Sequence, residues 1–198
     1  DACLVGSEMC IRDRRRTNLT TVTRLGWNSL TEILDEGGLS YPEVSGDSLA
    51  NEIDDMLCDL STSESTLIHS DLRADNLLFN TAGDGVMLVD WQGCSFGPSS
   101  FDITYHMIQS LSVDDRRKHE SELLDYYVNS LEFFGHQITI DEVHKLYRSS
   151  ILYSLSIACA VPLINDVEGP RVKELAFSMA SRTLAALEDH DIGFGQRG

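Results

Sequence analysis

Three short apolar segments lie close together near the middle of this chain. They cover residues 66–68, 76–79 and 86–89, and each is too short to be a helix that buries one face. A glycine-rich run from Ala82 to Gly85 separates the last two, which is typical of a hairpin turn. The pattern therefore predicts a small β-hairpin whose first strand begins at Asn76.

Apolar residues on both sides of this hairpin recur at helical spacing. Trp27, Leu30 and Ile33 indicate a helix that Gly37 and Gly38 end. Further helices are predicted over residues 47–60, 99–110, 115–134, 141–160 and 170–187. We therefore predict an α+β fold that is mostly α, a helical body with an inserted β-hairpin.

Charge and composition exclude several classes of function. The 198 residues carry a net charge of −17, from 32 acidic and 15 basic residues. Such a surface repels a phosphate backbone, so no nucleic-acid partner is expected. No apolar run reaches the ~20 residues that a membrane span needs, which predicts no membrane partner and a cytoplasmic location. The 5 cysteines show no CxxC spacing, which argues against a zinc site or a disulfide framework.

The residues around the predicted hairpin carry the chemistry. His69, Asp71 and Asn76 form an HxDxxxxN pattern, and Asp90 follows 19 residues after Asp71, at the end of the second predicted strand. The hairpin is expected to bring Asn76 and Asp90 back near Asp71. Phosphoryl transfer needs a carboxylate that orients the attacking hydroxyl and oxygen ligands for Mg²⁺. The pattern therefore predicts a kinase-type active site.

These motifs resemble a known superfamily. The segment 69–76, the run Asp90-Trp91-Gln92 and the following 97–102 are similar to the aminoglycoside phosphotransferase and choline kinase superfamily, in particular to its ecdysteroid kinase-like branch. The resemblance covers roughly residues 27–189. It implies the helical C-terminal lobe of a protein-kinase-like fold, and an ATP- and Mg²⁺-dependent transfer of a phosphoryl group to a hydroxyl of a small molecule.

The resemblance also implies roles for single residues. Asp71 would be the catalytic base, and Asn76 and Asp90 would bind the magnesium of the nucleotide cofactor. His69 would support the catalytic loop, and Asp102 would hold that loop from the next helix. Gln92 stands where many relatives carry an acidic residue, so no metal role is expected for it. From the sequence alone, Arg73 and Asp75 inside the loop are either contacts to substrate or phosphate, or solvated loop charges.

The two ends of the chain give separate expectations. Residues 1–14 resemble the translation of a sequencing adapter, so we expect a leader that is non-native or disordered. The kinase-like lobe is expected at 15–189, with a catalytic loop at 69–76, a metal loop at 90–98 and a helical part at 99–189, followed by a flexible tail at 190–198. The lysines lie at 118, 145 and 173, all after the catalytic loop. We therefore expect the N-terminal lobe, which binds the nucleotide and would be the natural intramolecular partner of this lobe, to be missing. We also expect this chain to be inactive alone.

Two other functions stay open at this stage. A metal-dependent hydrolase would use His69, Asp71 and Asp90 as ligands, but it leaves Asn76 without a role. A non-catalytic, pseudokinase-like binding module would keep the fold without the reaction, although all three signature residues are intact. Among the remaining patterns, Tyr126, Tyr127, Phe133 and Phe134 are predicted mostly as core, His106 as a surface residue rather than a ligand, and the GxGxxG of residues 193–198 as non-functional.

Overall fold

The computed structural model describes residues 2–164 and 169–194, with side chains from residue 16 onward. It forms two compact units, Asp1–Ser63 with Ile151–Gly198, and Glu64–Ser150. Helix α5 (Ile140–Ile164) contributes residues to both units. In the described part the chain is mostly helical with two small two-stranded sheets, which confirms the predicted fold class.

The first unit is built from helices. It contains α1 (Ala2–Glu36), α2 (Gly46–Asp59), a 3₁₀ turn (Leu60–Thr62), the second part of α5, and α6 (Pro170–Asp189). The apolar stripe predicted for the first helix is buried, and the indole N–H of Trp27 donates to the carbonyl of Val44 at 2.8 Å. Ser45 caps α2, because its hydroxyl accepts from the backbone N–H of Ser48 at 3.1 Å.

Helix α1 begins much earlier than the periodic pattern around Trp27 indicates. Residues 2–14 are helical in the structure, and their non-native origin stays a prediction. Residue 1 and residues 195–198 lie outside the described part. The end of the expected tail and most of the GxGxxG run therefore lie there too. The domain boundaries expected from the sequence also stay predictions.

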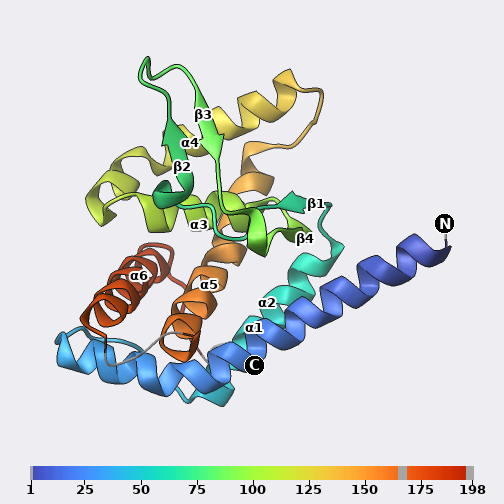
Figure 1. Ribbon diagram of the computed structural model, residues 1–198. Coiled ribbons are helices and arrows are strands. Elements are labelled where there is room, and N and C mark those ends of the chain that lie inside the picture. Colours follow the sequence, from blue (N-terminus) through green and yellow to red (C-terminus); the bar gives the residue numbers. More distant parts are fainter. Residues whose placement is uncertain (1, 165–168, 195–198) are drawn as a thin grey trace. The chain divides into compact units, whose positions relative to one another are not determined.

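The second unit carries both sheets (Figure 1). β2 (Leu77–Phe79) and β3 (Val86–Leu88) form the predicted hairpin, in which Leu77 pairs with Leu88. The side chain of Asn80 closes its turn by accepting from the backbone N–H groups of Asp84 and Gly85. β1 (Ser65–Ile68) pairs antiparallel with β4 (Ser95–Pro98), a strand that the sequence pattern missed because its Gly-Pro end is typical of a loop.

Helices α3 (Ser100–Ser110), α4 (Val113–Phe133) and the first part of α5 complete this unit. Ser112 caps α4 by accepting from the backbone N–H of Asp115 at 3.0 Å. The prediction of a core position was wrong for Tyr126, Phe133 and Phe134, which are 73%, 83% and 75% exposed. Helical spacing shows which side chains share a face, but not whether another element covers that face.

Helix α5 contains an 18-residue window that is long and apolar enough, by length and composition, to cross a membrane. However, 67% of that window is buried inside the protein. An apolar helix that packs against its own chain has the same composition as a membrane span. Its burial therefore identifies α5 as a core helix.

Candidate active site

The catalytic loop begins where strand β1 ends. Asp102 lies in the first turn of α3, and its carboxylate accepts two hydrogen bonds from the backbone of this loop. The donors are the N–H of His69 at 2.6 Å and the N–H of Ser70 at 2.8 Å. Ser70 has a φ of +73°, a left-handed conformation that is unfavourable for a residue with a side chain. The carboxylate of Asp102 thus holds the backbone in a sharp turn just before Asp71.

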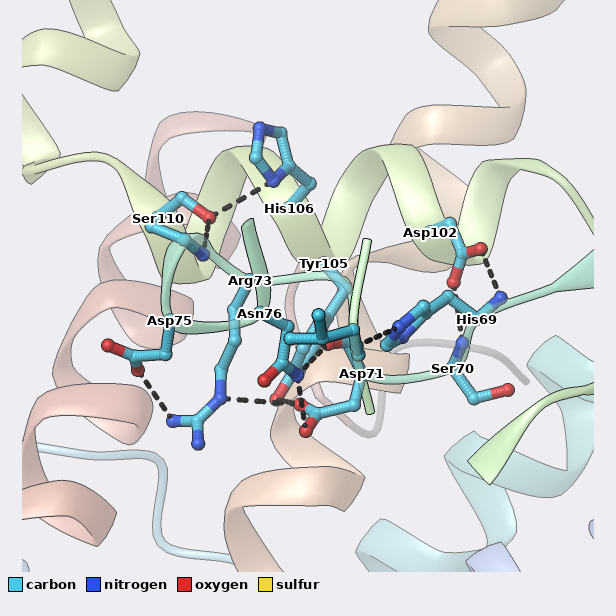
Figure 2. Close-up of polar contacts among 12 residues, drawn as sticks. His69, Ser70, Asp71, Arg73, Asp75, Asn76, Asp102, Tyr105, His106 and Ser110 are labelled. Carbon is cyan, nitrogen blue, oxygen red and sulfur yellow. Dashed lines mark hydrogen bonds and ion pairs between the residues drawn. The ribbon is translucent and has the colours of Figure 1, made fainter. Parts of the chain in front are cut away.

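Three side chains contact the carboxylate of Asp71 (Figure 2). The amide nitrogen of Asn76 donates to Oδ2 at 3.1 Å and to the backbone carbonyl of Asp71 at 2.8 Å. The hydroxyl of Tyr105, on α3, donates to Oδ1 at 3.0 Å. The guanidinium of Arg73 lies 3.5 Å from the same oxygen and 3.3 Å from Asp75. The loop therefore orients Asp71 tightly, and Arg73 contacts Asp71 rather than lying free in solvent.

The hairpin returns to the loop through Val89. Its N–H donates to the carbonyl of Asn76 at 3.0 Å, and its own carbonyl lies 2.8 Å from Nε2 of His69. A carbonyl only accepts, so Nε2 carries a proton that it donates to this carbonyl. Nδ1 is buried without a hydrogen-bond partner. The two bonds fix Val89, and Asp90 follows directly with a left-handed φ of +64°.

Two oxygen ligands fit a magnesium ion here. The amide nitrogen of Asn76 faces Asp71, which leaves the amide oxygen for a ligand. Asp90 is exposed and makes no side-chain hydrogen bond within the described residues. Mg²⁺ takes one or two protein oxygens and completes its shell with water and phosphate. Within the described residues no three His, Cys, Asp or Glu side chains converge on a metal position.

Sequence reasoning missed three residues of α3 that contact this loop, namely Tyr105, His106 and Ser110. Tyr105 lies one helical turn after Asp102, so the shared face of α3 was the signal that could have found it. The prediction that His106 is a surface residue was wrong. Its ring is partly buried, and Nδ1 lies 3.1 Å from the hydroxyl of Ser110. Burial lowers the pKa of His106, although the backbone of Leu72 and the charge of Asp102 raise it.

The fold and the loop define a class of protein, a kinase-like protein with a protein-kinase-like fold. An ethanolamine kinase from Plasmodium vivax has a similar structure, with a TM-score of 0.50 and 16% identity over 80% of this chain. At this identity the likeness shows the fold alone. The sequence profile of the ecdysteroid kinase-like family matches residues 40–137. Residues 40–137 therefore carry the sequence signature of the ecdysteroid kinase-like family, as the sequence motifs predicted.

A kinase-like protein of Caenorhabditis elegans is 33% identical over 86 residues, which cover 42% of this chain. Both relatives are longer than the part that they share with this chain. The matched region is 23% of the nematode protein and 47% of the ethanolamine kinase. The chain thus spans less than half the length of the proteins that it matches.

Proposed function

We propose that this chain is part of an ATP- and Mg²⁺-dependent phosphotransferase that acts on a hydroxyl of a small molecule. The match to this family's sequence profile supports the class. The observation that carries the proposal is the orientation of Asn76, whose amide nitrogen holds the carboxylate of Asp71 at 3.1 Å. One side chain thereby links the candidate base with the candidate metal position, as phosphoryl transfer requires.

In the proposed reaction, Asp71 orients the acceptor hydroxyl and accepts its proton, while the bond from the hydroxyl oxygen to the γ-phosphorus forms and the bond from that phosphorus to the leaving ADP breaks. Asn76 and Asp90 would hold Mg²⁺ through their side-chain oxygens. When bound, Mg²⁺·ATP supplies the phosphoryl group and neutralises the charge on its oxygens. Asp102 and His69 keep the two loops in place through the backbone of Ser70 and Val89.

We further propose that these 198 residues alone hold one side of the nucleotide site. Leu78, Phe79, Val86 and Met87 of the hairpin are all more than half exposed, which supports an apolar surface that a further part of the enzyme covers. Positioning supplies most of the catalysis in this class, so half a site is expected to give negligible turnover. A cytoplasmic location is also proposed, from the sequence alone.

Paramagnetic line broadening tests the metal site directly in this chain. Mn²⁺, titrated with ATP into isotope-labelled protein, is expected to broaden the amide signals around Asn76 and Asp90 first. Asp90→Ala should abolish this local effect. Asp84→Ala, in the exposed hairpin turn, is the matched control and should leave it unchanged. Broadening that does not depend on Asp90 would contradict the proposed magnesium site.

A radiolabel transfer assay tests the reaction itself. The chain is incubated with labelled ATP, Mg²⁺ and a panel of alcohols that includes amino alcohols, sugars and sterols. We expect little or no labelled product from this chain. Rapid transfer that survives Asp71→Asn would exclude Asp71 as the base. Mn²⁺·ATP binding that persists unchanged in both Asp71→Asn and Asp90→Ala would instead support a binding module.

A further inference from the structure

Four polar side chains on one face of α3 contact the catalytic loop in the order in which the loop runs. These residues are Asp102, Tyr105, His106 and Ser110. The last three follow Asp102 by 3, 4 and 8 positions, which places all four on the same face of the helix. Their contacts in the loop are, in turn, the backbone of His69 and Ser70, the carboxylate of Asp71, the backbone of Leu72 and the N–H of Ala74. Side chains of α3 therefore hold successive residues of the catalytic loop in place.

Tyr105 differs from the other three because it contacts a side chain instead of the backbone. Its hydroxyl donates to Oδ1 of Asp71, and the residue is only 1% exposed. The terminal torsion of an aspartate is broad and nearly two-fold, so its two oxygens exchange easily unless neighbours distinguish them. Tyr105 provides that distinction from a buried and therefore rigid position.

A count of acceptor positions indicates which oxygen remains for a ligand. A carboxylate offers about two acceptor positions on each oxygen. Oδ1 faces both the hydroxyl of Tyr105 and the guanidinium of Arg73, whereas Oδ2 receives the amide of Asn76. Oδ2 thus keeps an acceptor position, and its hydrogen bond comes from Asn76, which is a candidate metal ligand.

We propose that Tyr105 is a positioning residue that orients the carboxylate of Asp71 so that Oδ2 receives the acceptor hydroxyl. This inference rests on the proposed phosphotransferase function, since it assigns an oxygen to the base of that reaction. Tyr105 donates to Oδ1, which the guanidinium of Arg73 also faces as an ion pair at 3.5 Å, and the proton of the acceptor moves to Oδ2 as the phosphoryl group is transferred.

Tyrosine hydroxyl exchange, observed by NMR in a chain labelled with ¹³C at tyrosine Cζ, tests the contact without turnover. In mixed H₂O and D₂O, a slowly exchanging hydroxyl gives two Cζ signals. Tyr105→Phe assigns the signal, and Asp71→Ala is expected to shift it and to accelerate its exchange. The signal of Tyr147, whose buried hydroxyl donates to Glu120 at 2.7 Å, is the internal control and should not move. A Tyr105 signal that ignores Asp71→Ala would overturn the proposal.

Crystal structures of two variants test the orientation. Tyr105→Phe should leave the Asp71 carboxylate rotated or in two conformers, while Tyr147→Phe, an equivalent loss of a buried hydroxyl, should keep one conformer. If the Asp71 carboxylate keeps its single orientation in Tyr105→Phe, the proposed positioning role of Tyr105 is also overturned. Mn²⁺ broadening separates this failure from that of the proposed function, because it depends on Asp90 and is expected to survive in Tyr105→Phe.

Discussion

Replacing Glu120 by glutamine is expected to destabilise the second unit strongly. Its carboxylate accepts from Nη1 of Arg116 at 2.6 Å and from the hydroxyl of Tyr147 at 2.7 Å. The side chains of Arg116 and Glu120 are only 2% and 15% exposed. Burial, and then the charge of Glu120, raise the pKa of Tyr147 above its usual value, so its hydroxyl stays protonated and keeps donating.

The magnitude follows from the buried guanidinium. Glutamine has nearly the same shape, so no cavity forms, but the negative charge that Glu120 places beside Arg116 disappears. Removing one partner of a buried ion pair lowers the free energy of unfolding by about 3–5 kcal/mol. At ~2–4 °C per kcal/mol for a chain of this size, Tm should fall by roughly 6 °C or more. A small domain is stable by only ~5–15 kcal/mol, so the effect is large.

Urea unfolding followed by circular dichroism measures this change. The matched control is Glu122→Gln on the same helix, whose carboxylate is 82% exposed and pairs with His119 across 3.4 Å. An exposed pair of this kind is worth ~0–1 kcal/mol, so the control should unfold almost as the unaltered chain does. If both variants lose the same small amount of stability, the buried network is not a strong contributor and the reasoning fails.

Three further predictions concern other parts of the chain. Gly26→Ala should destabilise the first unit by about 1–3 kcal/mol in thermal unfolding, because the added Cβ would lie 1.9 Å from the carbonyl oxygen of Cys159. In native protein a maleimide should label exposed Cys94 but not Cys159, since burial raises the pKa of the Cys159 thiol and hides it; peptide mass spectrometry reports the sites. By NMR titration His106 should have a pKa below its ordinary value of 6.5, because its burial lowers it. Its contribution to stability is then present above about pH 6.5 and lost as the pH falls through the folded-state pKa.

The controls for these three follow from burial. Asn28→Ala, at an exposed position of α1, should change the stability far less than Gly26→Ala does. Maleimide labelling of Cys159 at the same rate as Cys94 would mean that the first unit opens readily. For His106, the test is whether His106→Gln reduces the stability lost between pH 7 and pH 5. An equal loss in both proteins would exclude this histidine as the source.

Much of the fold could be predicted from local sequence patterns. The hairpin followed from two short apolar segments around the turn at 82–85, and the helices after Pro98 followed from their periodicity and first-turn residues. Strand β4 could not be predicted in this way. It pairs with β1, whose residues are some 30 positions away in the sequence, and such a pairing leaves no local signal. Exposure of Phe133 and Phe134 was missed for the same reason, since burial depends on what packs against a face.

The sequence by itself determined which groups the site contains. The spacing of Asp71, Asn76 and Asp90 around a short hairpin was enough to predict the family and the class of chemistry, because that spacing is local. Only the tertiary structure decided how these groups are oriented. Tyr105 reaches Asp71 across 34 positions, and Val89 joins the hairpin to His69. Such contacts depend on how α3 and the hairpin pack against the loop, and packing is a property of the whole unit rather than of any one segment.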